Sequence, residues 1–225
     1  MGVSSTLNTI NHTFRKNKIF FILFACWVLV GGVLLFIYSR ETLFFAVNDI
    51  HSTFFDKLMT VMSGFGRGDC IPIILCSLIL VEGLRSAHYI FTTLSFGIVL
   101  PSIILLIKKF YGCPRPLVEF GLSRVHTVPW LDNAFYNSFP SGHTIGAFGF
   151  FMLLSFYLPK KQKLWSVLFF ALALGCGISR LYLGQHYFKD IYVGSLIGVM
   201  VSTVLFIVAE LLFGHRKSHK RKHSS

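Results

Sequence analysis

The chain has 225 residues, of which 54% are hydrophobic and only 13% are charged. A soluble domain carries about 25% charged residues, so this composition excludes an ordinary soluble enzyme and predicts an integral membrane protein. The net charge of +12 does not indicate nucleic-acid binding, because the basic residues lie in connections between apolar runs and form no single basic face.

Taken in chain order, six apolar runs are the predicted membrane spans. A helix needs about 20 apolar residues to cross the hydrocarbon core. The runs cover 19–38, 70–84, 89–107, 144–158, 164–181 and 191–213. No small-residue cleavage site follows the first run, which we expect to remain as an anchor. The fold class predicted is therefore an all-α integral membrane protein with six transmembrane helices over 19–213, a cytoplasmic N-terminus at 1–18 and a basic cytoplasmic tail at 214–225.

The start of the second span is ambiguous in the sequence. Apolar residues repeat at helical spacing between Ser52 and Gly68, which fits either an interfacial amphipathic helix or a tilted beginning of the span. Gly64, Gly66 and Gly68 predict a break in the helix at this point.

The Lys and Arg residues predict the orientation. With the N-terminus inside, most of the 21 Lys and Arg residues fall in connections assigned to the cytoplasm, as the positive-inside rule requires. Six spans then return the basic tail to the same side. This parity brings the end of the third span, the start of the fourth, the end of the fifth and the start of the sixth to the outer face.

Three motifs lie at those outer ends. They supply histidines, fixed cations, a helix-start hydroxyl and a carboxylate beside apolar segments, where a charge is unfavourable unless it serves a ligand or a partner. This set of groups is suited to binding a phosphate and reacting with it. The motifs are Lys108-x6-Arg115-Pro116, Pro140-Ser141-Gly142-His143 and Ser179-Arg180-x5-His186-x3-Asp190.

The third motif contains a candidate nucleophile. If the start of the sixth span is helical at this point, His186 and Asp190 share a face. A carboxylate on one imidazole nitrogen fixes the tautomer, and the other nitrogen can then attack phosphorus to form a phosphohistidine. Taken alone, the pair is more readily explained as an ordinary polar pair at a helix start, where Asp is favoured by the dipole.

The second motif has the residues of an anion site at a helix start. Ser141 is a good N-cap for the fourth span, Gly142 lets a ligand oxygen approach the backbone, and the free amides of the first turn bind anions. His143 would then lie beside the bound phosphate as a general acid. The alternative is a plain helix entry with an interfacial histidine.

Lys108, Arg115 and Arg180 would stabilise the negative charge of a phosphoryl transition state. Each of them, taken singly, could instead be a snorkelling cation at the end of a span. The nine acidic residues do not pair up in the outer motifs as a metal site would need, so we expect no metal and no cofactor. Cys113 could pair with Cys70, but we expect both thiols to be free.

Together the three motifs resemble the tripartite signature of the type 2 phosphatidic acid phosphatase (PAP2) superfamily at every fixed position. The resemblance extends over about the whole chain. It implies a PAP2-type helical bundle in which His186 is the nucleophile, Asp190 orients it and His143 is the general acid. The substrate-binding residues that it implies are Lys108, Arg115, Ser141, Gly142 and Arg180.

The resemblance also implies a metal-independent membrane lipid phosphatase. Its substrate would be a lipid phosphomonoester or diphosphate, such as undecaprenyl diphosphate, lipid A or a phospholipid phosphate. The single sequon lies on the expected cytoplasmic side, which favours a bacterial inner-membrane enzyme whose site faces the periplasm. The alternatives are a lipid phosphotransferase, a non-catalytic lipid-phosphate binding protein, and a vanadium haloperoxidase-like use of the pocket, which the apolar spans disfavour.

Overall fold

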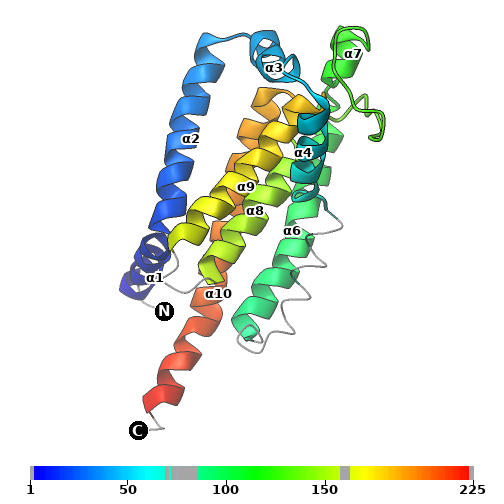
Figure 1. The fold of residues 1–225 in the computed structure, drawn as a ribbon. Helices are drawn as coiled ribbons and strands as arrows, with labels where there is room; N and C mark the ends of the chain where they lie inside the picture. The colour runs from blue at the N-terminus through cyan, green and yellow to red at the C-terminus, as the bar shows by residue number, and fades with distance from the viewer. Residues whose placement is uncertain (1–2, 69–70, 72–74, 76–85, 158–162, 223–225) are drawn as a thin grey trace.

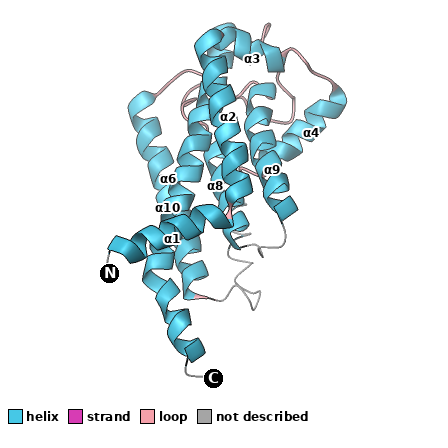
Figure 2. Cartoon of the chain, turned by 90° about the vertical axis from the view of Figure 1, so that its left-hand side faces the viewer, coloured by secondary structure: helices cyan, strands magenta, loops and turns pink. Residues whose placement is uncertain are grey.

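The computed structural model describes residues 3–68, 71, 75, 86–157 and 163–222. In this part of the chain every regular element is a helix (Figure 1). The long helices of the bundle are α2 (Lys18–Ile37), α6 (Ala87–Tyr111), α8 (Gly142–Tyr157), α9 (Lys163–Tyr182) and α10 (Phe188–Lys222). The shorter ones are α1 (Val3–Lys16), which crosses one end of the bundle in Figure 2, and α3 (Arg40–Asn48), α4 (Thr53–Gly64) and α7 (Pro116–Phe120).

The protein is an integral membrane protein. Four segments within the described residues are long and apolar enough to cross a bilayer, namely Lys18–Ile37, Ala87–Phe120, Leu164–Tyr182 and Phe188–Phe213. Helix α8 is also apolar but has only 16 residues. The four long segments match the first, third, fifth and sixth predicted spans, in that order, and α8 matches the fourth. The second predicted span falls largely outside the described residues, so the count of six stays a prediction.

Helix α8 lies at the centre of the bundle, in contact with α6, α9 and α10. Most of its residues are buried, as expected for a helix that is apolar all round. Phe156 stacks on Phe206 of α10 with ring centroids 4.1 Å apart. Gly198 of α10 allows close approach, because a Cβ there would lie 2.5 Å from the carbonyl oxygen of Ile145. A Cβ on Gly194 would likewise lie 3.0 Å from the carbonyl oxygen of Ser141, so the beginnings of α8 and α10 also lie beside each other.

The segment between α2 and the predicted break folds as two capped helices. Ser39 Oγ accepts a hydrogen bond from the amide of Thr42 at 3.1 Å, and Ser52 Oγ accepts one from Phe55 at 3.4 Å. Helix α4 ends at Gly64, where the glycines predicted a break. It packs against α9 (Figure 1), so it belongs to the bundle.

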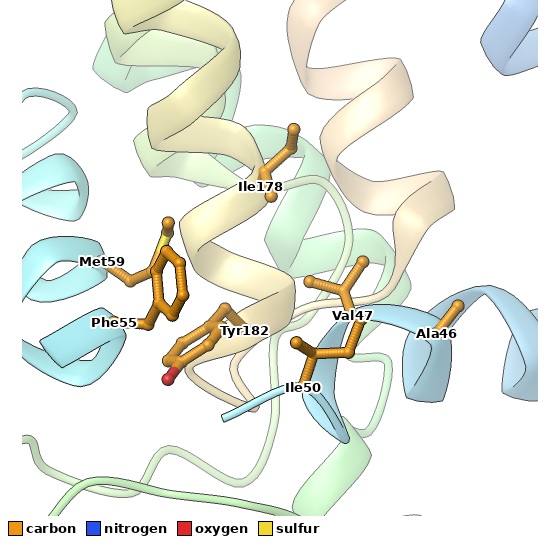
Figure 3. A pocket seen from close by; sticks show the side chains of 7 residues that line it. All are labelled: Ala46, Val47, Ile50, Phe55, Met59, Ile178 and Tyr182. Atoms are coloured by element: carbon orange, nitrogen blue, oxygen red, sulfur yellow. The ribbon is translucent and has the colours of Figure 1, made fainter. Parts of the chain in front are cut away.

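An apolar cavity of about 190 Å³ lies where α3, α4 and α9 meet (Figure 3). Its lining residues are all uncharged, so it lacks the groups that hold a phosphate. The residues that line it are Ala46, Val47, Ile50, Phe55, Met59, Ile178 and Tyr182.

The bundle has two distinct ends. Helix α1 and the last turns of α10, which continues through the basic tail as far as Lys222, lie at one end (Figure 1). Helices α3 and α7 lie at the other end, together with the end of α6, the start of α8, the end of α9 and the start of α10. The chain therefore brings all three motifs to this second end.

Candidate active site

His186 and Asp190 contact each other beside the start of α10. Nδ1 of His186 is 3.4 Å from Oδ2 of Asp190, and the two side chains are 2% and 5% exposed. The spacing predicted this pairing on the assumption that both residues are helical. That assumption is wrong for the histidine, because α10 begins at Phe188 and His186 lies in the turn before it.

This turn places the histidine. Gly184 has a φ of +69°, in the left-handed region that favours glycine, and a Cβ there would lie 2.7 Å from Cγ1 of Val125. The amides of Gln185 and His186 both donate to the carbonyl of Arg180, at 2.9 and 3.1 Å. The turn therefore ties His186 to the end of α9.

Asp190 joins the second and third motifs. Its Oδ2 accepts hydrogen bonds from Ser138 Oγ at 2.5 Å and from the amide of Tyr187 at 3.0 Å. Its backbone carbonyl accepts one from the amide of Ser141 at 3.1 Å. Sequence reasoning missed Ser138, and the only signal was its position two residues before the second motif.

The start of α8 has the predicted cap. Ser141 Oγ accepts hydrogen bonds from the amide of Thr144 at 3.4 Å and from its hydroxyl at 2.9 Å. Amides in the first turn of a helix have no intrahelical acceptor. Nζ of Lys108 lies 4.0 Å from the position that a Cβ on Gly142 would take, so the ammonium lies beside this helix start, where an anion is favoured.

Arg180 is buried, with one donor unused. Its Nη1 donates to Ser63 Oγ of α4 at 2.5 Å. Its Nε is buried and has no hydrogen-bond partner among the described residues. A buried donor without an acceptor is unfavourable unless a ligand completes it. Sequence reasoning missed Ser63 because α4 carries no motif.

Arg115 is largely occupied by the protein itself. Its Nε donates to the carbonyl of Tyr136 at 2.9 Å, and its Nη1 donates to the carbonyl and to Oε1 of Gln185 at 3.1 and 2.9 Å. A phosphate would have to bind the remaining Nη2. Gln185 directly precedes His186, so Arg115 also fixes the turn that carries the histidine.

The cations and the histidines form one electrostatic cluster around His143, in the first turn of α8. The imidazole of His143 interacts electrostatically with four other side chains, namely Arg180, His186, Arg115 and Lys108. Burial lowers the pKa of His186, which lies between α9 and α10, while the hydrogen bond to Asp190 opposes this shift. The imidazole is therefore neutral at neutral pH, as a nucleophile must be.

A second polar cluster holds the loop that leads to Ser138. Asp56 Oδ1 lies 2.8 Å from Nε2 of His126 and accepts a hydrogen bond from the Tyr182 hydroxyl at 2.7 Å. Nδ2 of Asn48 donates to the carbonyl of His126 at 3.0 Å, and Oδ1 of Asn48 accepts from the amide of His126 at 2.9 Å. These contacts attach the loop to α3, α4 and α9.

Among the described cysteines, Cys176 lies against the site, with its Sγ 3.8 Å from the carbonyl oxygens of Ser63 and His143. Cys26, Cys113 and Cys176 are free thiols, and Cys70, the partner considered for Cys113, lies outside the described residues. The prediction of a free Cys113 is therefore confirmed.

The profile of the PAP2 superfamily matches residues 86–212, which is more than half of the chain and includes all three motifs. The chain belongs to the PAP2 superfamily. Among relatives of this PAP2 protein, lipid A 1-phosphatase of Rhizobium etli is 31% identical over 53% of this chain and 49% of that protein. Undecaprenyl-diphosphatase BcrC of Bacillus subtilis is 27% identical over 72% of this chain and 79% of that protein.

The PAP2 chain spans about half the length of the first of these relatives. Two solved structures have the same fold. LpxE of Aquifex aeolicus has a TM-score of 0.62 at 24% identity, covering 75% of this chain and 96% of that one. A PAP2-type phosphatidylglycerolphosphate phosphatase of Bacillus subtilis has a TM-score of 0.61 at 22% identity, covering 84% and 94%.

Proposed function

We propose that this PAP2 protein hydrolyses a phosphomonoester or diphosphate on a membrane lipid, without a metal ion, through a phosphohistidine on His186. The observation that carries the proposal is the buried His186–Asp190 pair beside Arg180, whose Nε is buried without a partner. A binding protein would need the cations, but it would not need a buried histidine with a carboxylate on its Nδ1.

In the proposed first step, Nε2 of His186 attacks phosphorus. The Nε2–P bond forms while the bond from phosphorus to the lipid-side oxygen breaks, and His143 donates a proton to that oxygen. Asp190 stabilises the positive charge that develops on the imidazole. Negative charge on the equatorial oxygens is stabilised by the cations and by the first-turn amides of α8.

In the proposed second step, water attacks the phosphohistidine. His143, now neutral, accepts a proton from the water as the new P–O bond forms and the Nε2–P bond breaks. Inorganic phosphate leaves and His186 is regenerated. If an acceptor hydroxyl took the place of water, the same residues would transfer the phosphate, and this is the alternative function that the site allows.

The charge balance of the site supports metal independence. Within the described ranges, His, Cys, Asp and Glu side chains do not gather in groups of three that could hold a metal ion. The cluster of Lys108, Arg115 and Arg180 provides the positive charge that a metal ion would otherwise supply.

We propose a substrate whose tail stays in the bilayer while its phosphate enters the site, because the motifs lie at the ends of apolar helices. The named activities of the relatives favour lipid A or undecaprenyl diphosphate, followed by glycerophospholipid phosphates. The distribution of Lys and Arg supports an orientation with both ends of the chain in the cytoplasm and the site on the outer face, which for a bacterial inner-membrane protein is the periplasmic side.

The test is release of inorganic phosphate by purified protein in detergent with EDTA. The panel contains undecaprenyl diphosphate, lipid A, phosphatidylglycerol phosphate, phosphatidic acid and glucose 6-phosphate. We expect turnover of at least one lipid phosphate with far higher kcat/KM than glucose 6-phosphate, inhibition by vanadate, which mimics the transition state, and loss of about 10⁴-fold in the His186→Ala variant. Activity that needs Mg²⁺, or equal efficiency on the soluble phosphate, would contradict the proposal.

A further inference from the structure

Ser138 makes the shortest hydrogen bond to the catalytic carboxylate. Oδ2 of Asp190 is 2.5 Å from Ser138 Oγ, 3.0 Å from the amide nitrogen of Tyr187 and 3.4 Å from Nδ1 of His186. Hydrogen bonds weaken as they lengthen. The orientation of this carboxylate is therefore set by Ser138 and the Tyr187 amide more than by the histidine that it serves.

The backbone of Ser138 is fixed independently of Asp190. Its amide donates to the carbonyl of Cys113 at 3.0 Å, and the amide of Arg115 donates to the carbonyl of Phe135 at 2.8 Å. These bonds attach the loop to the segment that carries the first motif. Ser138 is only 1% exposed. Its hydroxyl is thus presented to Asp190 from a rigid and buried position.

Without the Ser138 hydroxyl, the carboxylate of Asp190 has room to rotate away from His186. A cavity of about 270 Å³ borders both Ser138 and Asp190, and its lining includes the cationic side chains of Arg40 and Lys189. A carboxylate released from Ser138 could turn toward these cations or toward water in the cavity. Either movement would take Oδ2 away from Nδ1 of His186.

We propose that Ser138 is a positioning residue for catalysis, which holds Oδ2 of Asp190 against Nδ1 of His186. The inference rests on the proposed function, because it assigns Ser138 a part in activating the same nucleophile. Ser138 acts through Asp190 and touches neither the phosphate nor the leaving group. Its loss therefore slows the chemical step and leaves substrate binding nearly unchanged.

The first part of the test compares kcat and KM of substituted proteins on the best lipid substrate. A hydrogen bond to a charged group corresponds to about 10- to 100-fold in rate, so Ser138→Ala should lower kcat by that factor with KM within about threefold. Ser138→Thr keeps the hydroxyl and should recover most of the rate. The matched control is Ser202→Ala, which removes another buried hydroxyl, bonded to the carbonyl of Gly149 at 2.9 Å, and should leave kcat within about twofold.

The second part is a double-mutant cycle with Asp190→Asn, which separates positioning from stability. In the Asp190→Asn background, Ser138→Ala should change kcat by less than about twofold, because a neutral amide does not stabilise the positive imidazolium and its position therefore no longer matters. An equal loss in both backgrounds, or unchanged kcat in the single variant, would overturn the inference while the wild-type protein remained active. A wild-type protein inactive on every lipid phosphate would overturn the proposed function, and this inference with it.

Discussion

At the scale of single residues, Arg180 combines two properties that oppose each other. The residue is 7% exposed and its Nε has no partner in the described part of the chain, which is unfavourable for folding. The same unpaired donor is available to a phosphate oxygen. Function and stability therefore make different demands at this position.

We predict that Arg180→Met abolishes turnover without lowering the melting temperature. Methionine fills a similar volume and leaves no buried charge, while the phosphate loses a donor in its site. Thermal unfolding in detergent and phosphate release measured on the same preparation check this. An active but destabilised variant would show that the guanidinium serves the fold and not the substrate.

Asp56 gives a pH-dependent prediction in the polar cluster that holds the loop. Burial would raise the pKa of its carboxyl, but hydrogen bonds from Tyr182 and His126 bring the pKa below its usual value. A lowered carboxyl pKa contributes stability above the unfolded value of about 3.9, and this is lost as the pH falls through the folded value.

The melting temperature of Asp56→Asn should therefore lie below that of the wild type at pH 6, and the two should converge as the pH falls below about 4. Thermal unfolding across this range checks the prediction. The control is Asp132→Asn, at an exposed loop position, which should follow the wild type. A difference in melting temperature between Asp56→Asn and the wild type that widens in acid would contradict a lowered pKa of Asp56.

At this scale, type and spacing in the sequence identified the residues that are proposed to carry the chemistry, and they missed the residues that hold these in place. Ser63 lies 117 positions from Arg180, Gln185 lies 70 from Arg115, and Ser138 lies 52 from Asp190. Their contacts depend on how helices pack, and no local pattern encodes them. Arg115 was predicted as a phosphate ligand, but its bonds to the loop and to Gln185 use most of its donors.

At the scale of elements, α4 packs against α9 and covers the site on that side. A Cβ on Gly66, just after α4, would press on the carbonyl oxygen of His143 and lie 2.7 Å from Sγ of Cys176. The backbone after α4 therefore packs directly on the first turn of α8, which carries the proposed general acid.

We predict that Gly66→Ala lowers kcat by at least about tenfold, because the added methyl group displaces the first turn of α8 and misplacing a catalytic group by about 1 Å has effects of this size. Gly64→Ala is the control, since a Cβ there meets nothing within 4 Å, and it should keep its activity. Phosphate release and helix content by circular dichroism are measured for both. Normal activity in Gly66→Ala would mean that His143 tolerates the movement or has no role in catalysis.

The apolar runs located the ends of the long helices within a few residues, because about 20 consecutive apolar residues form a helix in a bilayer. The exception is α10, which continues past the end of its apolar run to Lys222. The short helices α3 and α7 and the turn before α10 were not predicted. Their positions depend on caps and on contacts with other elements, such as those of Gly184 with Val125. The pairing of His186 with Asp190 was therefore predicted correctly, although from an assumed helix that does not include the histidine.

At the scale of the whole molecule, α1 and the last turns of α10 lie at the opposite end of the bundle from the site (Figure 1). The positive-inside rule assigns the end that carries α1 and the last turns of α10 to the cytoplasm. A single cysteine at Leu122, which is 67% exposed, should then react with an impermeant maleimide in intact cells when placed in a cysteine-free background.

The same reagent should label a cysteine at the exposed Asn8 of α1 only after the cells are opened. A fluorescent reporter fused after Ser225 should report the cytoplasmic side. Labelling of Asn8→Cys but not of Leu122→Cys in intact cells would invert the topology, and a periplasmic substrate would then be excluded.

The central claim is that phosphate passes through His186, and rapid-quench trapping with a ³²P-labelled lipid phosphate tests it most directly. During turnover in EDTA, the wild-type protein should carry an acid-labile, base-stable phosphoryl group that maps to His186, whose Nδ1 is held by Asp190. The label should be absent in His186→Ala. A phosphoryl group on another residue, or turnover with near-normal rates in His186→Ala, would contradict the account.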